Sequence, residues 1–206
     1  MILPSAATLL FRALALLIAA PFHEFAHGYA AAQLGDPTPR RAGRLTLNPL
    51  AHLDPLGTIL LLVFGFGWAK PVPIDPTYFP NWRRGLLTVA AAGPVANVVL
   101  AILFGFPFKI GLASPDGPGG GLLLTIVLIN AVLAIFNLIP IPPLDGSKIL
   151  VGILPGQLGL AYARLSAFGP LLLLLLLIAP ARVLGALIDR PLAWLVWLAT
   201  GLRFSL

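Results

Sequence analysis

Long apolar runs separated by short polar segments dominate the pattern of this chain. A helix crosses the hydrocarbon core of a bilayer with about 20 consecutive apolar residues. Runs of roughly that length lie at about 5–33, 85–106, 121–139, 160–179 and 183–204. The pattern therefore predicts an all-α integral membrane protein with a bundle of about five transmembrane helices.

The segment 55–73 breaks this pattern. Its uninterrupted apolar run covers about ten residues and is followed by glycines at 65 and 67 and prolines at 71 and 73. This length fits a short re-entrant element or a β-hairpin better than a full crossing. Irregular backbone at membrane depth must be shielded by protein or line a wet cavity. We therefore expect this element to cover or border such a cavity or another part of the protein.

Composition supports the lipid bilayer as the surroundings of the chain. Hydrophobic residues make up 59% and charged residues 10% of the 206 positions, whereas soluble domains carry about 25% charged residues. The basic residues behind the net charge of +6 do not gather on a polar domain, which argues against nucleic acid as a partner. The chain has no cysteine, so any metal must take nitrogen and oxygen ligands.

The basic residues also predict a topology, because cytoplasmic loops carry an excess of Lys and Arg. Five spans and a non-crossing 55–73 place Lys109 and Arg182 on one side and nine basic residues on the other. The nine are Arg40, Arg41, Arg44, Lys70, Arg83, Arg84, Lys148, Arg164 and Arg203. The prediction is a multi-pass protein of a prokaryotic inner membrane, with its N-terminus outside and its C-terminus in the cytoplasm. We expect one membrane-embedded domain over 1–206, with C-terminal helices at about 158–206.

The string HEFAH at 23–27 places polar residues inside the first predicted span. On a helix, His23 and His27 project from one face and can reach one ion, and Glu24 beside them can polarise a bound water. A chance string or a pair of satisfied buried histidines is the alternative. Because Glu24 inside a span is costly without a partner, the pattern favours a metal site.

A catalytic zinc takes three protein ligands, so a third ligand is needed. Asp145 lies in NLIPIPPLDGSK, where prolines end the preceding span and an extended segment can turn the carboxylate back into the bundle. The residues alone leave Asp145 evenly divided between a ligand and a plain turn. Asp189 precedes Arg190 and is interpreted as a capping or paired residue. The four aspartates interpreted as solvated loop residues are Asp36, Asp54, Asp75 and Asp116.

Two asparagines lie in predicted spans near this chemistry. In AAGPVANVV (91–99), Pro94 breaks a helical hydrogen bond, Gly93 allows close approach of another backbone, and Asn97 places an amide in the apolar layer. Kinks and polar contacts between helices explain such residues without any function. Asn97 and Asn137 are equally suited to hold a peptide backbone or an oxyanion beside a metal.

Together these motifs resemble the site-2 proteases, the intramembrane zinc metalloproteases of the M50 class. HEFAH at 23–27, GPVAN at 93–97 and NLIPIPPLDG at 137–146 match the family in order, and NPLAHLDPLG (48–57) and FGFGWAKPVP (64–73) are similar to it. The resemblance spans residues 21 to about 150, within a motif-bearing core at about 5–150. No stretch is long or polar enough for the PDZ or CBS domains of many relatives, so the chain looks like a minimal form.

The resemblance implies a role for each matched residue. His23, His27 and Asp145 would bind one catalytic Zn²⁺, and Glu24 would be the general base and acid. Asn97 and Asn137 would hold substrate or stabilise the oxyanion, and 55–73 would be similar to the family's membrane-embedded hairpin. His52 matches a loop pattern without a known role and is interpreted as a neutral surface histidine.

The expected function is hydrolysis of peptide bonds within or near transmembrane segments. By resemblance, the substrates are single-span membrane proteins or remnant signal peptides. The alternative is a metal-binding membrane protein without catalysis, either a transporter or a degenerate scaffold. A transporter would string ionisable residues through several spans, and a degenerate relative would typically have lost Glu24 or a ligand.

Overall fold

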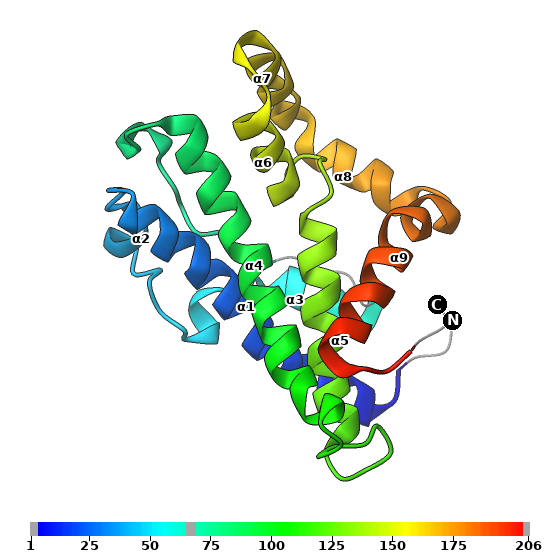
Figure 1. Cartoon of the computed structure of the whole chain (residues 1–206). Coiled ribbons are helices and arrows are strands. Elements are labelled where there is room, and N and C mark those ends of the chain that lie inside the picture. Colours follow the sequence, from blue (N-terminus) through cyan, green and yellow to red (C-terminus); the bar gives the residue numbers. More distant parts are fainter. Residues whose placement is uncertain (1–3, 65–68, 204–206) are drawn as a thin grey trace.

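The computed structural model describes residues 4–64 and 69–203. Helices build most of this part of the chain, with longer non-helical connections between α1 and α4 (Figure 1). Within it, the β pairing is limited to one antiparallel bridge between Leu53 and Ala69. The α-helices are α1 (Ala6–Gln33), α2 (Thr38–Arg41), α3 (Pro55–Phe64), α4 (Trp82–Lys109), α5 (Gly120–Asn137), α6 (Asp145–Ile153), α7 (Gly156–Ala163), α8 (Gly169–Ile178) and α9 (Ala181–Thr200).

Five stretches of helix are long and apolar enough to cross a membrane, which confirms the predicted all-α class and the number of candidate spans. Four of them are single helices. The fourth stretch, Gly156–Ile178, is α7 and α8 joined by a short 3₁₀ helix at Arg164–Phe168. This stretch is also the least buried, with 11% of its apolar window inside the structure, so it packs least against the rest of the bundle.

The described part of the segment 55–73 begins with a helix, α3, rather than with a strand. Residues 65–68 lie outside the described part of the chain. The backbone N–H of Lys70 donates to the carbonyl of His52 (2.8 Å), next to the Leu53–Ala69 bridge. The two ends of the segment therefore lie side by side at Leu53 and Ala69.

Small residues let the main helices pack closely. Ala15 and Ala19 of α1, Ala101 of α4, and Ala131 and Ala134 of α5 are fully buried. Lipid is as apolar as the side chains, so helices in a bilayer associate through close packing and polar contacts rather than through the hydrophobic effect. The buried alanines therefore fix how α1, α4 and α5 lie against one another, and these three helices carry most of the candidate site.

Helix α9 runs parallel to α4 and ends beside it. A β-carbon placed at Gly105 of α4 would lie 2.8 Å from the carbonyl oxygen of Ala199, so the two backbones are in contact. The ammonium of Lys109 donates to the carbonyl of Leu198 (3.0 Å). At the same end of the bundle, the ring of Phe11 in the first half of α1 lies against Gly121 at the start of α5.

The first half of α1 and the end of α9 therefore lie at one end of the bundle (Figure 1). The topology predicted from the sequence separates the two termini, because it counts five crossings. In the structure the chain returns toward Lys109 through α8 and α9, and α8 begins against Pro142 and Pro143 at the opposite end of α5. This arrangement puts Arg203 on the side of Lys109. The other eight of the nine basic residues predicted to be cytoplasmic stay on one side, so the excess of Lys and Arg on that side persists.

Cysteine labelling distinguishes the two topologies, and the chain has no native cysteine to remove. We expect Ala6→Cys and Arg203→Cys to react with a membrane-impermeant maleimide from the same face of sealed vesicles. Arg41→Cys, at the opposite end of the bundle, should react from the other face. Labelling of Arg203→Cys together with Arg41→Cys would support the predicted separation of the termini instead.

Candidate metal centre

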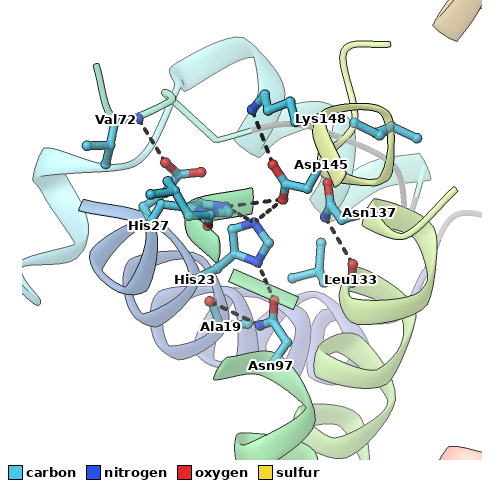
Figure 2. A network of polar contacts seen from close by, with 12 residues as sticks. Ala19, His23, His27, Val72, Asn97, Leu133, Asn137, Asp145 and Lys148 are labelled. Carbon is cyan, nitrogen blue, oxygen red and sulfur yellow. Dashed lines mark hydrogen bonds and ion pairs between the residues drawn. The ribbon is translucent and has the colours of Figure 1, made fainter. Parts of the chain in front are cut away.

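Three side chains from α1 and α6 converge on one point in the bundle. Nε2 of His23 lies 3.0 Å from Nε2 of His27, and these nitrogens lie 3.2 and 3.1 Å from Oδ2 of Asp145 (Figure 2). All three residues are buried. Within the described part of the chain, they form the group of His, Asp and Glu side chains whose ligand atoms lie close enough to hold a metal ion.

The hydrogen bonds of the two imidazoles fix which nitrogens face this point. Nδ1 of His27 lies 2.7 Å from the carbonyl oxygen of Val89, which can only accept, so Nδ1 carries the proton. Nδ1 of His23 lies 2.5 Å from Oδ1 of Asn97, and this oxygen is likewise an acceptor. In each neutral imidazole the Nε2 atom is then bare, so three lone-pair atoms face one another with no proton between them. Such an arrangement is stable when a cation lies among them.

The dimensions of the group fit zinc. Ligand atoms 2.0–2.1 Å from a tetrahedral ion are separated by about 3.3–3.4 Å, close to the 3.0–3.2 Å observed here. Two imidazoles and one carboxylate, with no thiolate, form a donor set typical of catalytic zinc. His23, His27 and Asp145 can therefore hold the metal, and a tetrahedral ion would retain one further position for water or substrate.

Two glycines make this convergence possible. A β-carbon at Gly93 of α4 would lie 2.4 Å from Nε2 of His27 and 2.7 Å from Cε1 of His23, so the imidazoles occupy the space above a bare backbone. A β-carbon at Gly146 would lie 2.2 Å from the carbonyl oxygen of Leu138. Helix α6 can therefore begin directly against the end of α5, which places Asp145 beside the histidines of α1.

Helix α6 presents Asp145 in its ionised form. Burial opposes ionisation, but the polar contacts with His23 and His27 and the nearby charge of Lys148 outweigh it and hold the pKa of this carboxyl below its usual range. The ammonium of Lys148 lies 3.2 Å from Oδ1, the oxygen that does not face the histidines. Asp145 thus offers Oδ2 to the metal site while Lys148 holds its other oxygen.

Glu24 lies on α1 beside the ligands and is held from outside the helix. Its Oε2 accepts a hydrogen bond from the backbone N–H of Val72 (2.9 Å). Two residues earlier, the N–H of Lys70 is bonded to the carbonyl of His52, and the guanidinium of Arg44 donates to the carbonyl of Lys70. The end of the segment 55–73 therefore fixes one carboxylate oxygen of Glu24 and leaves Oε1 available.

A cavity of about 890 Å³ contains the metal centre. His23, Glu24, His27 and Asp145 lie at its polar part, and the rest of its lining is mostly apolar. The apolar walls come from α1, α3, α4, α5 and α8, from the end of the segment 55–73 and from the residues directly after it. A cavity of this size with a few convergent polar groups is typical of a ligand or substrate site.

The two asparagines predicted near the metal have different surroundings. Asn97 is fully buried, and its Nδ2 donates to the carbonyl of Ala19 (3.3 Å) while its Oδ1 faces His23. A direct contact of Asn97 with substrate would require breaking these bonds. Asn137 lines the cavity and donates to the carbonyl of Leu133 (2.9 Å), so of the two asparagines it is the one exposed to a bound molecule (Figure 2).

The interpretation of His52 as a surface residue is wrong, because His52 is fully buried. Its Nε2 donates to the carbonyl of Thr46 (2.7 Å), and it lies outside the metal cluster. Asp36, interpreted as a solvated turn residue, is 1% exposed and accepts from the backbone N–H groups of Thr38 and Asp75 (2.8 Å each). Both residues brace the loops between α1 and α4, a task that a local turn pattern does not reveal.

The sequence interpretation missed Asn130, which lies at the middle of α5 and is fully buried. Its Oδ1 accepts from Nδ2 of Asn97 (2.8 Å), so it joins the polar network of the metal centre. A lone amide within an otherwise apolar span was the available signal. Alone, that signal is equally typical of ordinary polar contacts between helices.

Comparison with curated proteins identifies relatives in bacteria and an archaeon. The chain is 37% identical over 184 residues to "Putative zinc metalloprotease YwhC" of Bacillus subtilis, which covers 86% of this chain and 83% of that protein. It is 32% identical over 171 residues to "Putative zinc metalloprotease Rip2" of Mycolicibacterium smegmatis (77% and 63%). It is 38% identical over 135 residues to "Putative zinc metalloprotease MJ0611" of Methanocaldococcus jannaschii (63% of each).

The chain thus spans most of YwhC but slightly less than two thirds of Rip2 and MJ0611. No family model matches the chain. No solved structure matches it either.

Replacement of the proposed third ligand should abolish metal binding. We expect about one zinc per purified wild-type chain and a sharp loss in Asp145→Ala, measured by elemental analysis after equilibration with zinc. Asp116→Ala, in an exposed loop, is the matched control and should keep its zinc. Full occupancy in Asp145→Ala would mean that the third ligand lies elsewhere.

A methyl group at Gly93 should also lower zinc binding, although this substitution leaves all three ligand residues in place. Gly93→Ala places its β-carbon within 2.4 Å of Nε2 of His27, so the imidazoles must move apart and zinc occupancy should fall. Gly121→Ala is the control, because its methyl meets only the ring edge of Phe11 at 3.2 Å. Equal zinc content in the two variants would show that the observed approach of the imidazoles to α4 is not needed.

Proposed function

The chain belongs to the zinc metalloprotease family that these relatives represent, and we propose that it is an intramembrane protease of the site-2 type. It would hydrolyse peptide bonds within or near transmembrane segments of other membrane proteins. The proposal extends the family assignment by one step, from a metalloprotease to one whose reaction takes place at membrane depth.

The observation that carries the proposal is the position of the metal centre. His23 and His27 lie on α1, one of the helices long enough to span a bilayer, and both face a mostly apolar cavity. A soluble loop substrate would not need such walls, whereas an apolar segment of a membrane protein can be accommodated between them. Polar residues inside spans are costly and mark functional sites, so the cluster is best explained by chemistry at that depth.

In the proposed reaction, Glu24 is the general base and then the general acid. A zinc ion bound by His23, His27 and Asp145 would polarise the scissile carbonyl and make the attacking water more acidic. Glu24 takes a proton from that water as the water oxygen bonds to the carbonyl carbon. It then gives the proton to the amide nitrogen, and the carbon–nitrogen bond breaks to leave a carboxylic acid and an amine. The N–H of Val72 holds the other oxygen of Glu24 throughout.

Other residues of the cavity would bind the substrate. Asn137, with one N–H of its amide bonded to Leu133, retains a second N–H for a peptide carbonyl or the developing oxyanion. The apolar lining from α3 and α8 would contact substrate side chains. We propose single-span membrane proteins or remnant signal peptides as substrates, in the inner membrane of a prokaryote. Water would enter from the end of the bundle that carries most of the basic loops, which is the proposed cytoplasmic end.

Glu24→Gln separates catalysis from metal binding. Glutamine keeps an oxygen that can accept from Val72 but cannot take a proton from water. We expect zinc content to stay near one per chain and cleavage of co-reconstituted single-span reporter proteins to fall by at least about 10²- to 10⁴-fold. Reporter fragments are quantified by mass spectrometry, with Asp116→Ala as the active control. A Glu24→Gln variant as active as wild type would exclude the assigned role, and a wild type that binds zinc but cleaves no reporter would favour a non-catalytic scaffold.

A further inference from the structure

A polar chain leads from the metal centre into α5, away from the cavity. It begins at His23, passes through Asn97 of α4 and ends at Asn130, and both asparagines are fully buried. Because both are fully buried, neither lipid nor bulk water can supply them with an alternative hydrogen-bond partner. Each hydrogen bond of this chain therefore constrains the next.

His23 needs a particular neighbour in order to bind a metal through Nε2. Its proton must be on Nδ1, which requires an acceptor facing that nitrogen. Asn97 provides this acceptor with Oδ1. If the amide of Asn97 were turned over, its NH₂ group would face Nδ1, and the proton of His23 would be displaced to Nε2. The orientation of one amide therefore determines whether His23 is a ligand.

Two acceptors hold Asn97 in the required orientation. Its NH₂ group donates to Oδ1 of Asn130 at 2.8 Å and to the carbonyl of Ala19 at 3.3 Å. The shorter of the two bonds is the one to Asn130. Asn130 is itself oriented, because its own NH₂ donates to the carbonyl of Ile126 (2.9 Å), one turn earlier on α5. A backbone carbonyl can only accept, so it fixes which end of the Asn130 amide faces Asn97.

We propose that Asn130 is a positioning residue for the metal site: through Asn97, it holds His23 in the tautomer that presents Nε2 to zinc. The carbonyl of Ile126 orients the amide of Asn130, this amide orients that of Asn97, and Asn97 in turn fixes the tautomer of His23. Asn130 touches neither the metal nor the cavity, so its effect is exerted on metal affinity through orientation alone. The inference rests on the proposed zinc site and does not depend on which substrate is cleaved.

The test measures zinc affinity by competition with a chelator in the purified full-length protein. Asn130→Leu keeps the volume but removes the acceptor, and we expect zinc to bind about 10- to 100-fold more weakly, as is typical when an outer partner of a ligand is lost. Asn130→Asp keeps an oxygen facing Asn97 and should lie closer to wild type. Thermal unfolding of the metal-free proteins shows whether each variant is folded.

A second background distinguishes orientation from packing. A carboxylate at position 97 presents oxygen to His23 whichever way it is turned, so Asn97→Asp removes the need for Asn130. We therefore expect Asn130→Leu to weaken zinc binding much less in the Asn97→Asp background than in wild type. An equal loss in both backgrounds would overturn the proposal and indicate that Asn130 only fills space.

Nitrogen-15 spectra of the metal-free protein report the same effect without any metal. The chain has three histidines, so the ring nitrogens of His23 can be assigned by comparison with a His23→Gln variant. We expect a single tautomer protonated at Nδ1 in wild type and a mixture in Asn130→Leu. An unchanged tautomer with unchanged zinc affinity in Asn130→Leu would refute the inference. A wild type that binds no zinc at all, but shows the predicted tautomer change, would instead count against the proposed metal function.

Discussion

The convergence of three bare acceptor atoms in an apolar interior is the constraint on which the rest of this structure depends. Nε2 of His23, Nε2 of His27 and Oδ2 of Asp145 lie within 3.2 Å of one another, and no hydrogen bond can relieve them while both Nδ1 atoms hold the protons. Their mutual repulsion must be offset by a cation or resisted by the packing around them. Most of the unusual features of the fold provide the packing that holds these three atoms together.

Each element around the centre removes one way for the ligands to move apart. The bare backbone at Gly93 accepts the imidazoles, and the carbonyl of Val89 holds His27 from the side of α4. Close packing of Gly146 on the end of α5 brings α6, and with it Asp145, to the histidines. Because these contacts come from α1, α4, α5 and α6, the site exists only when all four helices are assembled, and its metal in turn would tie α1 to α6.

The sequence predicts the elements of this centre better than it predicts their surroundings. Hydropathy identifies the spans, because a bilayer of fixed thickness sets their length. The i, i+4 spacing of His23 and His27 fixes their common face, since both lie on one helix. Asp145 is ambiguous from the residues alone, because its place depends on how α6 packs on α5, and only the resemblance to known proteases resolves it. The burial of His52 and Asp36 depends on loops that fold against each other, which no local pattern records. The direction of α9 likewise depends on its pairing with α4, which neither hydropathy nor a count of basic loop residues records.

The arrangement also explains why base and metal ligands are supported from different sides. The two histidine ligands are fixed by Asn97 and Val89 of α4, inside the bundle, where hydrogen bonds are shielded from solvent and so maintain geometry well. Glu24 is fixed by Val72, near the end of the segment 55–73, and this part of the chain also lines the cavity. A molecule in the cavity can therefore contact Val72, which holds the base, and also Val89 and Lys148, which hold His27 and Asp145. Asn97 and Asn130, behind His23, do not line the cavity, so the support of His23 is the part of the metal centre that lies farthest from a bound molecule's reach.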